Sequence, residues 1–139
     1  MNKQIERNYL EINSINELRE TFSPSKDYKI QLIQPSDFQL NKFFYKRVGK
    51  KHNWIDRLEW SDKNWIEYVS NKNVKTYVLT AKNDLAGYFE LIFHSDKNEI
   101  EIAYLGLLEE YQNKKLGSFL LSSAIRNSFR EEAKRVCVH

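Results

Sequence analysis

The chain of 139 residues has one cysteine, two prolines and one methionine, and it contains no long run of apolar residues. Because Cys137 is alone, an internal disulfide is excluded, and thiolates are too few for a cysteine-based metal site. The histidines His52, His94 and His139 lack the spacing of metal ligands, so we expect no metal. Met1 leads into charged residues rather than an apolar signal core. With no stretch long enough to cross a bilayer, a cytoplasmic protein that avoids membranes is expected.

A strong excess of one charge is also missing. The 22 lysines and arginines nearly balance 19 aspartates and glutamates, giving a net charge of +3. No long basic run alternates with aromatic residues, so we expect no nucleic-acid partner. The hydrophobic content of 41% and the aromatic content of 14% are typical of a folded protein. No repeat or linker divides the chain, and its length predicts a single domain over residues 1–139.

Residues 99–129 carry the most informative pattern in the chain. Residues 99–108 alternate as a strand does, with Ile100, Ile102 and Tyr104 predicted on one face. The opposite face is predicted to carry Glu99, Glu101, Ala103 and Leu105. Residues 109–113 break this strand, and a helix is predicted over 114–132. Its apolar residues recur at helical spacing, namely Leu116, Leu120, Leu121, Ala124, Ile125 and Phe129.

The start of this helix has an unusual charge. Asn113 suits the N-cap, yet the first turn then holds Lys114 and Lys115 beside the positive end of the helix dipole. Acidic residues there would be more stable by roughly 0.3–1 kcal/mol each. A bound polyanion would reverse that preference, because free backbone N–H groups and lysines both attract phosphate. We therefore predict a phosphate cradle at this helix start.

The remaining pattern predicts a mixed α/β fold with a mostly antiparallel central sheet flanked by helices. One helix is expected after Asp37 and to end at Gly49, and a second is expected to start at Ser61 with Trp65, Ile66 and Val69 facing the core. Strands are expected over residues 9–12, 28–33, 74–80, 85–93 and 135–139. The exposed edge of the last strand could pair with a second copy, which would give a homodimer.

The segment Gln112-Asn113-Lys114-Lys115-Leu116-Gly117 resembles the (Gln/Arg)-x-x-Gly-x-(Gly/Ala) motif of the GNAT N-acetyltransferase superfamily. The order of elements along the chain resembles that family too. The resemblance implies a GNAT-like acyl-CoA N-acyltransferase fold, with acetyl-CoA as co-substrate and no metal. Lys115 stands where the family usually has its first glycine. The family continues with a further helix and two strands where this chain stops, so the expected fold is short at its C-terminus.

The resemblance also assigns roles to residues. It implies that the pyrophosphate is held by Gln112, Asn113, Lys114, Lys115, Leu116, Gly117 and Ser118. It further implies that Leu105, Gly106 and Leu107 pair with the pantetheine arm, and that the Leu107 N–H is an oxyanion donor. Taken alone, Gly106 could equally be a glycine that merely ends a strand.

Glu101 is the candidate general base. It lies eleven residues before Gln112, the spacing at which family members with a glutamate base on this strand carry it. A base for an ammonium group would be expected to lie buried beneath the covering helices. The alternative is an ordinary solvated glutamate on a strand, on the same face as Glu99.

Trp54, Arg57 and Trp60 form a candidate site for the acceptor substrate. Exposed aromatic rings with an arginine can bind a ligand. The alternative is that both tryptophans belong to the core and that Arg57 pairs with Asp56 or Glu59.

The sequence thus predicts an enzyme that moves an acetyl group from acetyl-CoA to an amine by direct attack, with Glu101 as base. The acceptor would be the amine of a small molecule or a peptide. The alternative is a non-catalytic module that binds acyl-CoA or a protein partner, which Lys115 and the short C-terminus favour.

Overall fold

The computed structural model describes residues 10–12, 23–112, 116–130 and 135–138. Within these ranges two strands precede two helices, three strands follow, and a helix and a last strand close the order. The elements are β1 (Leu10–Ile12), β2 (Tyr28–Leu32), α1 (Phe38–His52), α2 (Asp62–Ser70), β3 (Val74–Ala81), β4 (Asp84–His94), β5 (Glu99–Leu107), a 3₁₀ turn (Glu109–Tyr111), α3 (Leu116–Arg130) and β6 (Arg135–Val138).

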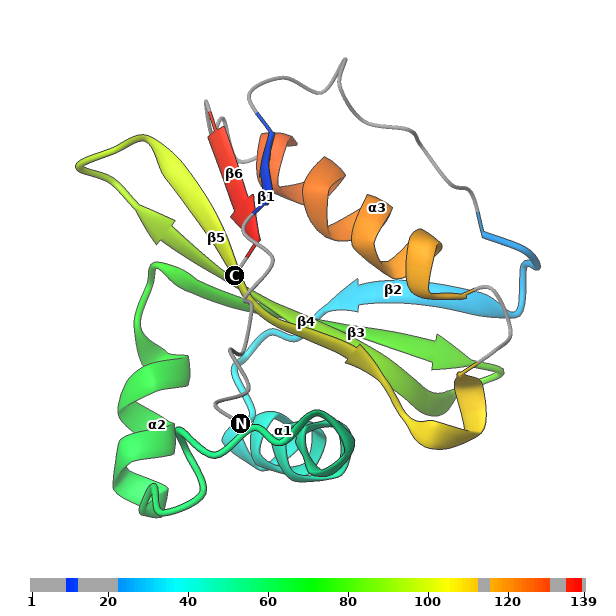
Figure 1. The fold of residues 1–139 in the computed structure, drawn as a ribbon, viewed down its shortest axis with the longest axis horizontal. Helices are drawn as coiled ribbons and strands as arrows, with labels where there is room; N and C mark the ends of the chain where they lie inside the picture. The colour runs from blue at the N-terminus through cyan, green and yellow to red at the C-terminus, as the bar shows by residue number, and fades with distance from the viewer. Residues whose placement is uncertain (1–9, 13–22, 113–115, 131–134, 139) are drawn as a thin grey trace, which may run out of the picture.

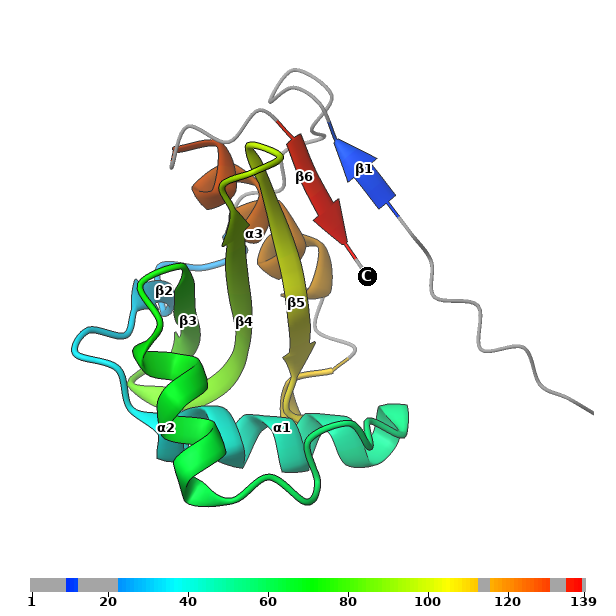
Figure 2. The same cartoon turned by 90° about the vertical axis from the view of Figure 1, so that its left-hand side faces the viewer.

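The strands form one sheet in the order β1-β6-β5-β4-β3-β2. Only β5 and β6 are parallel among its pairs, and the other neighbours are antiparallel. α3 covers one face of the sheet, while α1 and α2 cover the other (Figures 1 and 2). The expected mixed α/β fold with a mostly antiparallel sheet between helices is therefore confirmed.

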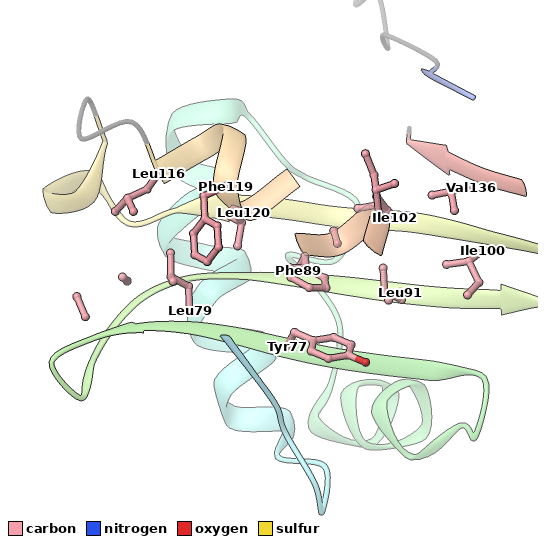
Figure 3. Packing of buried hydrophobic residues seen from close by; sticks show 14 residues of the cluster. Tyr77, Leu79, Phe89, Leu91, Ile100, Ile102, Leu116, Phe119, Leu120 and Val136 are labelled. Atoms are coloured by element: carbon pink, nitrogen blue, oxygen red, sulfur yellow. The ribbon is translucent and has the colours of Figure 1, made fainter. Parts of the chain in front are cut away.

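Two apolar clusters lie on the two faces of the sheet. The larger one joins α3 to the strands, with Leu116 and Leu120 against Leu79 and Phe89 (Figure 3). The smaller one lies beneath α1, where the ring of Phe44 stacks on Tyr88 with centroids 4.8 Å apart. Burial of these side chains on both faces holds the sheet between its helices.

α1 begins where predicted but runs further than predicted. The Asp37 side chain accepts a hydrogen bond from the Gln39 N–H, as an N-cap does. The helix does not end at Gly49. It continues to His52 and is capped by Asn53, whose φ of 56° is left-handed. Gly49 has a packing role instead, because a Cβ there would lie 2.8 Å from the Trp54 Cβ.

α2 starts at the predicted cap. Ser61 and Asn64 form a reciprocal capping box, in which each side chain accepts from the other's backbone N–H. Trp65 and Val69 are buried as expected, but Ile66 is 46% exposed. The prediction that Ile66 faces the core was wrong, because the helix is short and buries a narrower stripe.

A bulge in β5 reverses the predicted alternation of its side chains. Glu90 of β4 lies opposite Tyr104 and Leu91 lies opposite Ile102, so Ala103 is an extra residue. Ile102 therefore joins the cluster under α3, whereas Tyr104 joins the one under α1. The predictions that Tyr104 shares a face with Ile102, and that Leu105 lies on the face opposite Ile102, were wrong for this reason.

The last strand does not offer the open edge expected from the sequence. β1 pairs antiparallel with β6, from Leu10 opposite Val138 to Ile12 opposite Val136. The argument for a homodimer through β6 therefore loses its basis. In the described part of the chain, no helix has both the length and the apolar character that a membrane span needs.

Candidate functional site

The candidate site lies along the second half of β5. β6 pairs with β5 only from Glu99 to Ile102, where Val138 is the last partner. From Ala103 to Leu107, β5 keeps β4 as a neighbour on one edge. On the other edge, no strand among the described residues pairs with it. Among the described residues, the second half of β5 therefore has one edge with no strand paired to it, called here the open edge.

The backbone of β5 directs hydrogen-bond donors toward this open edge. The Leu108 N–H donates to the Ala86 carbonyl at 2.8 Å, so Leu108 turns its backbone groups toward β4. Neighbouring residues of a strand turn theirs to opposite edges. The N–H of Leu107, and by the same alternation that of Leu105, is therefore directed toward the open edge. The Leu107 carbonyl turns the same way and accepts from Gln112 Nε2 at 3.3 Å.

A groove of about 300 Å³ follows this edge toward the start of α3. β5, α3 and the end of α1 all contribute to its walls. The lining residues are Lys51, His52, Leu105, Gly106, Leu107, Gln112, Gly117 and Leu120. The lining combines apolar side chains with the polar side chains of Lys51, His52 and Gln112, so the groove suits a ligand with both characters.

Five residues that the sequence predicted for the cofactor line this groove together: Leu105, Gly106, Leu107, Gln112 and Gly117. A Cβ on Gly117 would meet no atom within 4 Å, so this glycine leaves free space at the first turn of α3.

The other predicted cofactor residues lie differently. Leu116 is fully buried in the core, so its side chain does not reach the groove, and Ser118 is exposed beside it. Asn113, Lys114 and Lys115 lie outside the described residues.

Gly106 has a structural role that the sequence did not show. A Cβ at Gly106 would lie 2.3 Å from Val48 Cγ1 of α1, so only glycine allows α1 to pack on the end of β5. The bulge of this strand is at Ala103 rather than at Gly106. Gly106 thereby brings the end of α1 to the groove.

Glu101 lies on the face of β5 that α1 and α2 cover, and it pairs with a histidine. Its Oε1 is 3.0 Å from His94 Nε2 on β4. Its side chain remains 25% exposed, and that of His94 38% exposed. Glu101 is therefore not enclosed beneath the helices as expected, and solvent or a ligand can reach it.

Arg57 is not available to a substrate. Its side chain is 7% exposed and its Nη1 donates to Glu90 Oε1 at 2.9 Å. The predicted alternatives, Asp56 and Glu59, were the wrong partners, because β4 brings a fully buried carboxylate beneath the loop. Glu90 also accepts from Asn41 Nδ2 at 2.8 Å and from the Tyr68 hydroxyl at 2.7 Å.

The Arg57 guanidinium is enclosed by aromatic rings. Its Cζ is 4.1 Å from the Tyr68 ring centroid and 4.4 Å from that of Tyr104. Burial alone would lower the pKa of Arg57, but Glu90 and Tyr68 together raise it, so the cation persists. This buried group fixes the loop between α1 and α2.

The two tryptophans of the predicted acceptor site are half-buried. Trp60 packs on Trp65 and Tyr68, and its ring centroid lies 4.7 Å from the Arg57 guanidinium. Trp54 packs on Tyr104 and stacks on His52. Trp54 is thus the one of the three that adjoins the groove, through His52.

Lys51 and His52 are the groove residues that sequence reasoning missed. No local pattern could reveal them, because they meet the groove only once α1 has crossed the end of β5.

Comparisons with known proteins bear on the family and the fold. The sequence profile described as the Acetyltransferase (GNAT) family matches residues 32–139. An aminoglycoside acetyltransferase from an uncultured soil metagenomic sample superposes with a TM-score of 0.66 at 12% identity, covering 81% of this chain and 77% of its own. A search of curated protein sequences finds no match.

Two further solved structures were determined in complex with coenzyme A. The PaiA N-acetyltransferase of Thermoplasma acidophilum gives a TM-score of 0.57 at 21% identity, covering 76% of this chain and 75% of its own. A Bacillus subtilis acetyltransferase gives 0.54 at 20% identity, covering 76% and 60%. At these identities the structures support the fold alone, whereas the profile spans most of the sequence, and on that ground this chain belongs to the GNAT family of acetyltransferases.

Proposed function

We propose that this protein is an N-acetyltransferase that uses acetyl-CoA and acetylates an amine by direct attack. The observation that carries the proposal is the groove along the unpaired edge of β5. Its lining includes Leu105 and Leu107, whose N–H groups are directed to this edge, together with Gln112 and the bare Gly117. Coenzyme A has matching parts: an amide-bearing arm that can pair with a strand edge, and phosphates that suit a helix start.

When bound, acetyl-CoA would supply an acetyl group activated as a thioester, and its C–S bond would break as the new C–N bond forms, so that coenzyme A leaves as a thiolate and takes a proton from water. In this proposal the open edge of β5 holds the arm, and residues 112–118 hold the pyrophosphate. The Leu107 N–H donates a hydrogen bond to the carbonyl oxygen as negative charge develops on it, which lowers the barrier. The direction of this N–H, away from β4, supports that role.

Glu101 has the role of general base, directly or through a water molecule. An amine must lose its proton to attack, and a carboxylate can accept it. The observation that supports the assignment is that the side chain of Glu101 stays partly exposed, so a water molecule can reach its carboxylate. His94 holds Oε1, which leaves Oε2 to accept the proton. Small-molecule and peptide amines are the acceptor classes proposed.

The test is a thiol-release assay with acetyl-CoA and a panel of small amines and peptides, with mass spectrometry of the products. The proposal expects thiol release that needs both protein and amine, with one acetyl group added per amine. Binding of acetyl-CoA without turnover on any amine would instead identify a non-catalytic acyl-CoA-binding module. Calorimetry that detects no binding at millimolar acetyl-CoA would overturn the proposal.

A further inference from the structure

We propose that Lys51 and His52, at the C-terminal end of α1, form a second wall of the phosphate site. They would bind the phosphate groups of coenzyme A from the side opposite the start of α3. This inference rests on the proposed function and extends it, because the 112–118 motif contains neither residue. The ligand chemistry is a phosphate dianion or diphosphate beside Lys51, Gln112 and Gly117.

The first argument is the placement of Lys51. It lines the groove together with Gly117, and its Nζ donates to Gln112 Oε1, across the chain from α1. Gln112 in turn donates to the Leu107 carbonyl at 3.3 Å. A single chain of contacts therefore joins the end of α1, the first residue of the motif and the open edge of β5.

The second argument is the kind of partner that Lys51 has. Gln112 is a neutral amide, and no carboxylate in the described part of the chain pairs with Lys51. Lys42 on the same helix differs, because its Nζ lies 3.0 Å from Asp62 Oδ1. Because the partner of Lys51 is a neutral amide, no carboxylate offsets the positive charge of this lysine at the groove. Hydrogen bonds from Lys51 to a phosphate would therefore be charge-assisted.

The third argument is the way His52 is held. His52 lines the groove and stacks on Trp54, with ring centroids 5.8 Å apart and planes 28° apart. Trp54 in turn packs against Gly49, where a Cβ would be only 2.8 Å from the Trp54 Cβ. The absence of a side chain at Gly49 thus allows Trp54 to pack against α1. Trp54 in turn orients the imidazole of His52, whose N–H can donate a hydrogen bond to phosphate.

These contacts complement the start of α3. Leu116 and Gly117 present helix backbone at one side of the groove, and Gly117 adds no side chain to block approach. The end of α1 adds the side-chain cation. Phosphate between the two would meet backbone dipoles on one side and a charge on the other.

The experiment compares Lys51→Glu with Lys50→Glu by calorimetry with coenzyme A. Lys50 is the matched control, because it is exposed one residue earlier on α1 and does not line the groove. Both variants change the net charge equally. We expect Lys51→Glu to weaken binding by roughly tenfold and Lys50→Glu by roughly twofold at low salt, with the gap closing near 1 M salt. His52→Phe keeps the stacking and should weaken binding by a few-fold.

Ligand fragments identify which phosphate is bound. Pantetheine, which has no phosphate, should bind both lysine variants like wild type. Dephospho-CoA lacks the 3′-phosphate but keeps the diphosphate. If Lys51→Glu still binds dephospho-CoA more weakly than Lys50→Glu does, Lys51 contacts the diphosphate. If the two variants bind dephospho-CoA equally, Lys51 contacts the 3′-phosphate. Equal affinities of the two folded variants for coenzyme A would overturn the inference while leaving the proposed function intact. Failure of wild type to bind coenzyme A would overturn both.

Discussion

Two glycines of the groove lack a side chain for opposite reasons. Gly106 is constrained by the fold, since a Cβ would collide with Val48 at 2.3 Å. Gly117 is not, since a Cβ there would meet nothing within 4 Å. A glycine in a helix that the packing does not require costs stability, so its presence is better explained by a ligand that approaches the backbone.

We therefore expect Gly117→Ala to separate stability from binding. The alanine should raise the free energy of unfolding by roughly 0.5–1 kcal/mol at most, because it favours the helix. The same methyl group should weaken coenzyme A binding, and Gly117→Glu should abolish it through bulk and like charge. Urea unfolding and calorimetry with coenzyme A measure the two effects. Undiminished binding by Gly117→Glu would show that the phosphate site is elsewhere.

At the scale of elements, the sequence predicted which segments are helices and strands better than how they meet. The caps at Asp37 and Ser61 are local chemistry, and both were predicted correctly. The bulge at Ala103 was not, because it depends on how β4 pairs with β5. The same limit applies to Arg57, whose partner Glu90 lies on a distant strand.

The residues of the candidate site also divide into those that local sequence predicts and those that depend on contacts between distant elements. Five of the groove's lining residues were predicted from a motif and the strand before it, namely Leu105, Gly106, Leu107, Gln112 and Gly117. Lys51 and His52 could not be predicted, because their place at the groove depends on the contact between α1 and β5. That contact needs Gly106 beneath Val48.

This contact gives an element-scale prediction. Gly106→Ala should lower the free energy of unfolding by roughly 1–3 kcal/mol, because the added methyl overpacks against Val48. Val48→Ala combined with it should restore part of the loss, since the smaller side chain leaves room for the methyl. Urea unfolding of both single variants and the pair gives the coupling. Additive losses in the pair would mean that α1 does not pack on β5 through these residues.

For the whole molecule, buried tyrosines link stability to alkaline pH. Burial raises the pKa of Tyr68 and Tyr88 above the usual range, and the nearby Glu90 adds to the effect. Burial also raises the pKa of Tyr104. An unfolded tyrosine ionises near pH 10, so above that pH only the unfolded chain releases these protons. Their contribution to stability is therefore present below about pH 10 and lost as the pH rises further.

Tyr88→Phe tests this link. The Tyr88 hydroxyl is buried and has no hydrogen-bond partner among the described residues, so its removal should not cost stability at pH 7. The variant should also lose less stability than wild type between pH 9 and about pH 11. The reason is that the variant lacks a hydroxyl that ionises more readily in the unfolded chain than in the folded one. Urea unfolding across this range measures both. A loss of more than about 1 kcal/mol at pH 7 would mean that the hydroxyl has a partner.

The central claim, catalysis at the open edge of β5 with Glu101 as base, is tested most directly by Glu101→Gln in the thiol-release assay. The exchange keeps the shape of the side chain and removes the proton acceptor. Acetylation should slow by about 10²–10⁴-fold, while acetyl-CoA affinity stays within about twofold of wild type. The loss should shrink as the pH rises, because more of the amine is then already neutral.

Glu67→Gln, which changes an exposed carboxylate on α2, is the control and should leave the rate unchanged. Wild-type turnover in Glu101→Gln at every pH would contradict the account, because proton removal would then not depend on this carboxylate.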